Sequence, residues 1–302
     1  MKQPLIFDIK RYAINDGPGI RIAIFFKGCP LSCIWCHNPE SISANPQKMY
    51  TASKCIGCGE CVKACPNHAC ILTPNGIVTD SERCDLNAQC AVVCPTLATE
   101  ISGYYKTIPE LLQIIETERI LFDQSGGGVT FSGGEPLLHS NYLIKILDEC
   151  GKNQIHRTID TCGFVKKDIL LDVARHTDLF LYDLKLMDPD KHQEYTGVDN
   201  KLILSNLVAL AKTGVDIQIR IPLIKGVNTD QENLSATAAF IAELAGKKKS
   251  VSLLPYHDIA THKYQKLGES YLADNLTEPD AADLQQAINC FLAHDLLATI
   301  GG

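Results

Sequence analysis

The chain has 302 residues, 45% of them apolar, which is enough to bury a large core in one α/β domain with or without an insertion. Its net charge of −7 lacks the basic excess that nucleic-acid binding or a polybasic membrane anchor requires. The N-terminus has no apolar run of the kind found in a secretory signal, and no stretch of about eighteen apolar residues occurs. We therefore expect a cytoplasmic protein with neither nucleic acid nor membrane as a partner.

Thiols are concentrated in the first third of the chain. Eleven of the fourteen cysteines lie between Cys29 and Cys94. In a reducing cytosol, cysteines at this density are more often metal ligands than disulfides. The other three lie in apolar or helical contexts, where a buried inert thiol is the ordinary interpretation; they are Cys150, Cys162 and Cys290.

The first predicted strand covers residues 21–29 and continues into a loop with three cysteines, Cys29, Cys33 and Cys36. This loop contains no fourth cysteine. Because a 4Fe-4S cluster takes four ligands, a cluster held here would leave one iron open. An open iron can bind a substrate, so we expect this loop to carry chemistry.

Residues 49–103 lack the alternation of strands and helices that follows them. They contain CIGCGECVKACP at 55–66, which has the C-x2-C-x2-C-x3-C-P spacing of a bacterial ferredoxin. Soft thiolates suit iron–sulfur clusters or zinc, so a zinc knuckle is the alternative. The run predicts a 4Fe-4S site in a ferredoxin-like insertion.

A second run, CDLNAQCAVVCP at 84–95, keeps the same register but has Asn87 where the second cysteine is expected. In two-cluster ferredoxins the fourth cysteine of each run ligates the other cluster. The first cluster would then be held by Cys55, Cys58, Cys61 and Cys94, and the second by Cys65, Cys84 and Cys90. The remaining ligand is open among Cys70, Asp85, Asn87 and water; a three-iron cluster and no cluster are further alternatives.

After the insertion, apolar strands alternate with amphipathic helices. The predicted strands after 21–29 are 127–135, 156–163, 178–185, 216–224 and 250–257, and the helices are 108–122, 141–153, 166–177, 200–214 and 232–248. Apolar strands joined by single helices indicate parallel pairing with right-handed crossovers. Six units predict a partial (β/α)6 TIM-type barrel made of residues 1–48 and 104–302, with the ferredoxin-like domain at 49–103 inserted. A doubly wound sheet is the alternative.

The ends of these strands carry polar residues. In a barrel the carboxyl ends of the strands carry the chemistry. The residues found there are Ser132, Gly133, Gly134, Glu135, Asp160, Thr161, Asp183, Leu184, Lys185, Arg220 and His257.

The pattern C-x3-C-x-aromatic-C, with Trp35 as the aromatic residue, resembles the radical S-adenosylmethionine (SAM) superfamily. In that superfamily the three cysteines hold a 4Fe-4S cluster whose open iron binds SAM, and reduction cleaves SAM into methionine and a 5′-deoxyadenosyl radical. SGGEP at 132–136 resembles the superfamily's Gly-Gly-Glu motif, which receives the amino group of SAM. Alone, this glycine pair would indicate only a tight turn after a strand.

Further segments resemble the glycyl radical enzyme activating enzymes: DGPGIR at 16–21, CHNPES at 36–41, DTCG at 160–163, DLK at 183–185 and LLPYH at 253–257. The resemblance spans essentially the whole chain and extends to the subgroup with a ferredoxin-like insertion, from which Asn87 is the main departure. It implies an anaerobic oxidoreductase that takes an electron from flavodoxin or ferredoxin and cleaves SAM. The product radical abstracts a hydrogen from a backbone glycine of a pyruvate formate-lyase-like partner enzyme.

The same resemblance implies residue roles. Cys29, Cys33 and Cys36 would hold the catalytic cluster, Lys185 would pair with the SAM carboxylate, and His257 would contact its nucleoside. Asp160, Thr161 and Asp183 resemble a monovalent-cation site. The full set of implied SAM-binding residues is Trp35, Cys36, His37, Ser132, Gly133, Gly134, Glu135, Asp160, Asp183, Leu184, Lys185, Arg220 and His257.

Ordinary alternatives remain for several of these residues. Lys185 or Arg220 could form a surface ion pair, and His257 could be a hydrogen-bonded rim histidine. For the whole chain the alternatives are a radical SAM enzyme that acts on a small molecule or peptide, a ferredoxin-type electron carrier, and a zinc-binding module.

Overall fold

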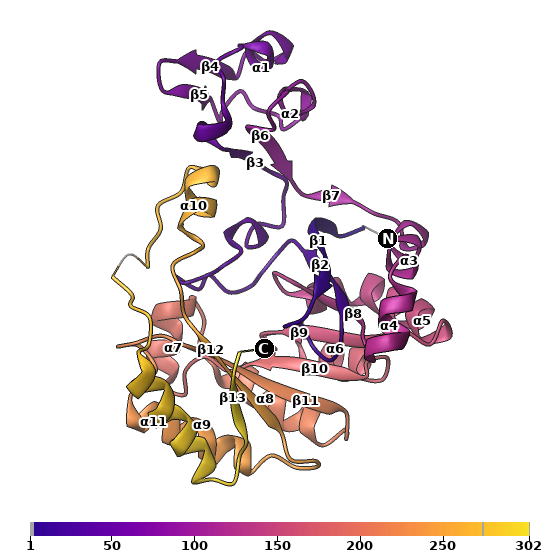
Figure 1. The fold of residues 1–302 in the computed structure, drawn as a ribbon, viewed down its shortest axis with the longest axis vertical. Helices are drawn as coiled ribbons and strands as arrows, with labels where there is room; N and C mark the ends of the chain where they lie inside the picture. The colour runs from indigo at the N-terminus through magenta and orange to yellow at the C-terminus, as the bar shows by residue number, and fades with distance from the viewer. Residues whose placement is uncertain (1–2, 274, 302) are drawn as a thin grey trace.

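The computed structural model describes residues 3–273 and 275–301, and its main body is a nine-stranded sheet (Figure 1). The strand order is β13-β12-β11-β10-β9-β8-β2-β1-β7. The parallel strands are β2 (Arg21–Phe26), β8 (Gly128–Gly133), β9 (His156–Thr161), β10 (Leu179–Asp183), β11 (Asp216–Leu223), β12 (Ser250–Pro255) and β13 (Ala298–Ile300). At one edge, β1 (Leu5–Ala13) and β7 (Tyr104–Tyr105) pair antiparallel.

All six predicted strands form, which confirms the prediction of a mostly parallel α/β sheet. From β2 to β12 they pair in the order of the chain. A doubly wound sheet reverses its strand order at a switch point, so that alternative is wrong. A partial barrel has this sequential order. Sequence analysis did not identify β1, β7 and β13.

Helices connect successive strands. Four predicted helices form, as α5 (Ser140–Lys152), α6 (Lys167–Ala174), α8 (Lys201–Ala211) and α9 (Gln231–Ala242). In the described part of the main body, three further helices were not predicted: α7 (Pro189–Thr196), α10 (Thr261–Leu267) and α11 (Ala281–Leu292). Three short 3-10 helices also form, η1 (Pro39–Ser41), η2 (Ala52–Lys54) and η3 (Pro136–His139).

The helix predicted at 108–122 is two helices, α3 (Ile108–Glu116) and α4 (Arg119–Ser125). The break lies at Thr117 and Glu118. The hydroxyl of Thr117 donates to the carbonyl of Ile114 at 2.6 Å, and the backbone of Glu118 leaves the helical region with φ −102° and ψ 10°. The apolar period continues across this break, which explains why the sequence pattern predicts one helix.

The strands alternate between the core and the opposite face of the sheet. In β11, Ile217, Ile219, Ile221 and Leu223 are buried in the main apolar core, which also receives the apolar face of α5. Because side chains alternate along a strand, Arg220 points to the opposite face. The core therefore fixes the direction in which this arginine projects.

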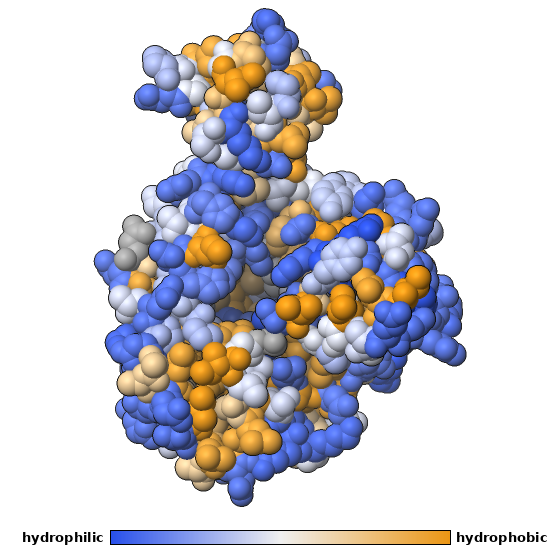
Figure 2. All heavy atoms as spheres, viewed as in Figure 1, coloured by the Kyte–Doolittle hydropathy of each residue, from blue (hydrophilic) through white to orange (hydrophobic). Residues whose placement is uncertain are grey.

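Residues 47–102 form a small unit that projects from the sheet at the top of Figure 1. It contains a sheet of β3 (Gln47–Tyr50) with β6 (Thr99–Ser102), a sheet of β4 (Cys70–Thr73) with β5 (Gly76–Thr79), and the helices α1 (Glu60–Ala64) and α2 (Gln89–Val92). Figure 2 shows the main body hollowed beneath this unit. Within the described residues, no helix is long and apolar enough to cross a membrane.

Candidate active site

A cavity opens at the carboxyl ends of the parallel strands, beside the three-cysteine loop. Eleven residues predicted for the site line it: Cys33, Trp35, Cys36, His37, Ser132, Gly133, Asp160, Asp183, Lys185, Arg220 and His257. Five other predicted residues lie outside its lining: Cys29, Gly134, Glu135, Thr161 and Leu184. The structure thus brings together residues that are separated by more than two hundred positions in the sequence.

Some lining residues were not predicted. They include Asn15, Asp16, Asn38 and Tyr256. Asp16 and Tyr256 belong to the DGPGIR and LLPYH segments. The resemblance of these two segments is therefore the sequence signal that could have identified both residues. The Oδ2 atom of Asp16 is buried without a hydrogen-bond partner among the described residues.

Backbone hydrogen bonds hold the three-cysteine loop on two sides. The N–H of Cys29 donates to the carbonyl of Ile42 at 3.1 Å, and the N–H of Ile34 donates to that of Tyr195, at the end of α7, also at 3.1 Å. Burial raises the pKa of Cys33 to about 11 and that of Cys36 to about 12. Both thiols are therefore protonated at neutral pH, and iron must displace their protons on binding.

The glycines of the SGGEP segment let the end of β8 touch this loop. A Cβ atom on Gly134 would lie 2.2 Å from the carbonyl oxygen of Gly28, and one on Gly133 would lie 2.3 Å from the nitrogen of Phe26. Gly133 also has φ +112°, which side chains disfavour. The N–H of Glu135 donates to Gly28 at 2.8 Å. Only glycine permits this approach.

Glu135 is fully buried and points into the protein. Its carboxylate accepts hydrogen bonds from the Thr161 hydroxyl at 2.7 and 2.8 Å, from the Cys162 N–H at 2.9 Å and from the Leu137 N–H at 3.1 Å. Burial raises the pKa of Glu135, although these hydrogen bonds oppose the shift. Glu135 thereby ties the end of β8 to the end of β9, and its contact with SAM stays a prediction.

Lys185 and Asp183 form an ion pair at the cavity wall, with 2.7 Å between Nζ and Oδ2. Burial acts to lower the pKa of Lys185, but the charge of Asp183 and its hydrogen bond with Lys185 outweigh burial and raise that pKa above its usual range. Lys185 therefore stays a cation. Leu184, between them, is buried in the core, and its N–H donates to the carbonyl of Arg220.

Arg220 and Asp160 face each other across the cavity floor. Their Nη1 and Oδ1 atoms are 3.5 Å apart, and Asp160 also accepts a hydrogen bond from the Ser132 hydroxyl at 2.7 Å. Burial raises the pKa of Asp160 to about 6. The Nε and Nη1 atoms of Arg220 are buried without a hydrogen-bond partner in the part of the chain that the structure describes. Such donors are costly to leave unpaired, so they suit a ligand that brings an oxygen acceptor.

Aromatic rings form another part of the cavity wall. The rings of His37 and His257 stack with 4.4 Å between centroids and 23° between planes, and Tyr256 lies 6.3 Å from His37. Burial and the neighbouring His257 lower the pKa of His37, so it is neutral near pH 7. Stacked rings offer a flat surface to a planar aromatic ligand.

The proposed cation ligands do not all point into the cavity. Asp160 and Asp183 line it, whereas Thr161 is buried and donates its hydroxyl to Glu135. Among the described residues, no three histidine, cysteine or carboxylate side chains converge as ligands of one metal ion would.

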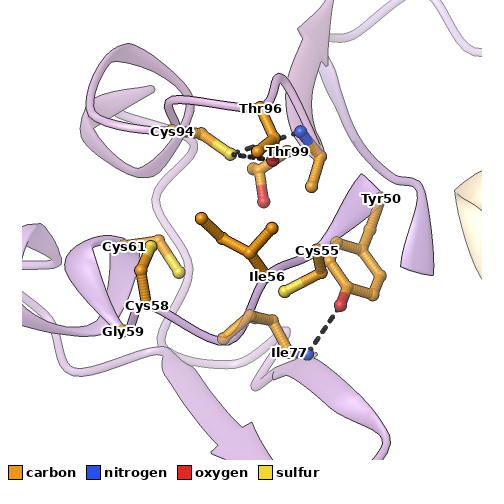
Figure 3. Close-up of a pocket in the computed structure, with 11 residues that line it drawn as sticks. Tyr50, Cys55, Ile56, Cys58, Gly59, Cys61, Ile77, Cys94, Thr96 and Thr99 are labelled. Carbon is orange, nitrogen blue, oxygen red and sulfur yellow. Dashed lines mark hydrogen bonds between the residues drawn. The ribbon is translucent and has the colours of Figure 1, made fainter. Parts of the chain in front are cut away.

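The small unit gathers cysteines from both ferredoxin-type runs. Cys55, Cys58, Cys61 and Cys94 line one small cavity together with Tyr50 and Thr99 (Figure 3). In two-cluster ferredoxins the fourth cysteine of each run ligates the other cluster. These four cysteines are the set that this rule predicts for the first cluster. Cys65, Cys70 and Cys90 lie in an apolar cluster that shares Cys61 with this cavity, and Cys84 packs against the cluster.

Comparisons with known proteins agree with this arrangement. The family model for the radical SAM superfamily matches residues 23–237. The chain is 41% identical over 300 residues to the trans-4-hydroxy-L-proline dehydratase activating enzyme of Clostridioides difficile, covering 99% of each chain. It is 37% identical over 304 residues to the choline trimethylamine-lyase activating enzyme of Oleidesulfovibrio alaskensis, covering 99% of this chain and 98% of that one.

A solved structure is also similar. It is a domain of pyruvate-formate lyase-activating enzyme from Bacteroides vulgatus, with a TM-score of 0.51 and 41% sequence identity over 58% of this chain and 99% of that domain. The family match covers the three-cysteine loop and most of the strands that border the cavity. The chain therefore belongs to the radical SAM superfamily and, within it, to the family of glycyl radical enzyme activating enzymes.

Proposed function

We propose that this chain binds a 4Fe-4S cluster through Cys29, Cys33 and Cys36, cleaves SAM reductively, and abstracts a hydrogen atom from a backbone glycine of a partner enzyme. The observation that carries the proposal is the cavity itself. Two of the three thiols line it, and so do the side chains of Arg220 and Lys185. An open cluster and SAM would supply the one-electron chemistry, and the chain would supply position and shelter.

The residues of the cavity fit the functional groups of SAM. Lys185 and Arg220 offer positive donors for its carboxylate. Two carboxylates offer acceptors for its amino group. One is Asp160, which also contacts Ser132, and the other is Asp16, whose Oδ2 atom has no hydrogen-bond partner among the described residues. The stacked rings of His37 and His257 offer a surface for the adenine.

Other residues act by holding these groups in position. Glu135 fixes the end of β9, and the glycine pair lets the three-cysteine loop rest against β8. Asp183 orients Lys185. Because a carbon radical reacts with oxygen and with unintended hydrogens, the buried walls of the cavity serve to exclude both solvent and oxygen. A monovalent cation beside Asp160 and Asp183 remains part of this proposal.

We assign residues 49–103 to a ferredoxin-like domain inserted between 1–48 and 104–302. The shared cavity of Cys55, Cys58, Cys61 and Cys94 supports one added 4Fe-4S cluster, and a second cluster would use Cys65, Cys84 and Cys90. These clusters would pass an electron from ferredoxin or flavodoxin to the three-cysteine site; the alternative role of the domain is to help dock the partner enzyme. The relatives are named for partners that include a dehydratase and a lyase; for this chain the partner class is a glycyl radical enzyme.

The test is anaerobic reconstitution with iron and sulfide, followed by addition of SAM and dithionite. The proposal predicts 5′-deoxyadenosine and methionine in equal amounts, both dependent on the reductant. A fully reconstituted protein that binds SAM but forms no 5′-deoxyadenosine would contradict it. Zinc in place of iron, without the charge-transfer absorbance of an iron–sulfur cluster, would contradict the cluster assignment.

A further inference from the structure

The two cysteine runs of the small unit have the same backbone conformation, 29 positions apart. Left-handed residues occur at matching places: Gly57 and Leu86 have φ 71° and 56°, and His68 and Leu97 have φ 50° and 53°. Positive φ is uncommon for any residue other than glycine. The repetition therefore reflects one loop fold used twice, and residues of one run can be matched to residues of the other.

The fourth cysteine of each run is held in the same way. The N–H of Ala69 donates to the sulfur of Cys65 at 3.2 Å, and the N–H of Ala98 donates to the sulfur of Cys94 at 3.2 Å. Each of these cysteines is followed, five positions later, by the first residue of a strand. That residue is Cys70 at the start of β4 and Thr99 at the start of β6.

Thr99 shows where this position lies relative to a cluster site. It lines the cavity of Cys55, Cys58, Cys61 and Cys94, and it is buried. By the repeat, Cys70 takes the corresponding place in the other half. It is 4% exposed and belongs to a buried cluster with Cys61, Cys65 and Cys90, against which Cys55 and Cys84 also pack.

Asn87 and Asp85 were the oxygen-bearing candidates for the remaining ligand of the second cluster, and their side chains hydrogen-bond to each other. Asn87 is exposed; its Oδ1 accepts from the Gln89 N–H at 3.0 Å and its Nδ2 donates to Asp85 at 2.6 Å. Asp85 is also exposed. An amide or carboxylate oxygen is a hard donor, whereas iron–sulfur clusters favour soft thiolates.

A cation lies beside Cys70. The Nζ atom of Lys48, from β3, is 3.2 Å from the Cys70 sulfur and 2.8 Å from the Thr79 hydroxyl. An ammonium group next to a thiolate ligand offsets part of the negative charge of a four-thiolate cluster.

We propose that Cys70 supplies the fourth thiolate of the second inserted cluster, so that its ligands are Cys65, Cys70, Cys84 and Cys90. The missing cysteine at position 87 of one run is thus replaced by an additional cysteine in the other. This inference rests on the proposed ferredoxin-like domain and completes its second site as an all-cysteine 4Fe-4S cluster.

The test uses a Cys29→Ala/Cys33→Ala/Cys36→Ala background, so that only the inserted clusters bind iron. Iron, sulfide and ⁵⁷Fe Mössbauer spectra are measured after anaerobic reconstitution. The background protein is expected to hold about eight irons per chain. Adding Cys70→Ala is expected to lower the iron content to about seven per chain if the second cluster keeps three irons, with a three-iron spectrum, or to about four if that cluster is lost. Cys150→Ala, at an equally buried thiol outside the unit, is the matched control and is expected to change nothing.

A second variant separates ligation from folding. In Cys70→Ala/Asn87→Cys a thiolate returns at the position that the first run uses, and about eight irons are expected to be restored. If Cys70→Ala keeps the full iron content and spectrum, or if Asn87→Cys fails to restore them, the assignment of Cys70 is overturned while the ferredoxin-like domain stands. If the background protein binds no iron–sulfur cluster at all, both the assignment and the domain proposal are overturned, and SAM cleavage by the unmodified chain remains a separate test.

Discussion

Arg220 on β11 reaches over β10 to Asp160 on β9, leaving 3.5 Å between its Nη1 atom and the carboxylate oxygen. Its Nε and Nη1 atoms nevertheless have no hydrogen-bond partner among the described residues. The arginine is held in place by charge and keeps donors free for a ligand. This is the pattern expected of a side chain that binds a carboxylate.

Replacing Arg220 by Met should therefore weaken SAM binding. A hydrogen bond to a charged group contributes about 1.5–3 kcal/mol, which corresponds to about a 10- to 100-fold rise in Kd. The measurement is SAM titration of the reconstituted protein by calorimetry, with iron content as a check. Arg157→Met is the matched control, because Arg157 pairs with Asp178 at the opposite ends of the strands, with 2.7 Å between Nη2 and Oδ1. Equal Kd values for the two variants would contradict the role of Arg220.

Replacing Cys29, Cys33 and Cys36 by Ala should abolish SAM cleavage. Most of the iron bound by the small unit should stay in place. The physical reason is that these ligands belong to a different loop from the cysteines of the small unit. The measurement is 5′-deoxyadenosine formation together with iron analysis. Substantial 5′-deoxyadenosine from this variant would exclude the loop as the site of the chemistry.

Gly134→Ala should displace the three-cysteine loop without touching a ligand. Its Cβ would lie 2.2 Å from the Gly28 oxygen, so one backbone must move, at a typical overpacking cost of about 1–3 kcal/mol. We expect lower iron occupancy at the catalytic site and lower 5′-deoxyadenosine yield. Gly214→Ala is the control, because a Cβ there meets nothing within 4 Å and only backbone strain results. Matching iron content and yield in the two variants would show that the close contact has no role in the site.

Replacing Cys58 and Cys61 by Ala should separate electron delivery from catalysis. Both line the small cavity of the inserted unit, and neither lines the cavity beside the three-cysteine loop. If the inserted clusters relay electrons, SAM cleavage should persist with dithionite and fail with flavodoxin or ferredoxin. A docking role instead preserves cleavage with every donor and abolishes radical formation in the partner. If the variant lacks the first inserted cluster but matches the wild type in both SAM cleavage and radical formation in the partner, the small unit has only a structural role.

The sequence predicts the sheet well, because its strands are short apolar runs bounded by polar ends. In β8 and β11 the same residues that form the strand also fix which side chains face the cavity. Helix α7 was not predicted because PDKHQEYT has no apolar stripe; its Asp188 N-cap and its contact with the three-cysteine loop stabilise it instead.

Other features depend on tertiary contacts that a sequence pattern does not contain. Glu135 is in a motif expected to face SAM, yet its partners are Thr161 and Cys162, 26 and 27 positions away. Likewise, only the folded repeat matches Cys70 to Thr99, since no spacing rule for ferredoxin runs includes either residue.

The central claim is that the hydrogen removed by this chain comes from a glycine of a partner protein. The most direct measurement uses a candidate glycyl radical enzyme from the same genome, labelled with α-deuterated glycine, mixed anaerobically with the reconstituted chain, SAM and reductant. We predict a glycyl radical signal in the partner by electron paramagnetic resonance and deuterium in the 5′-deoxyadenosine. Unlabelled 5′-deoxyadenosine and a partner without a radical, found for every glycyl radical enzyme of that genome, would contradict the claim.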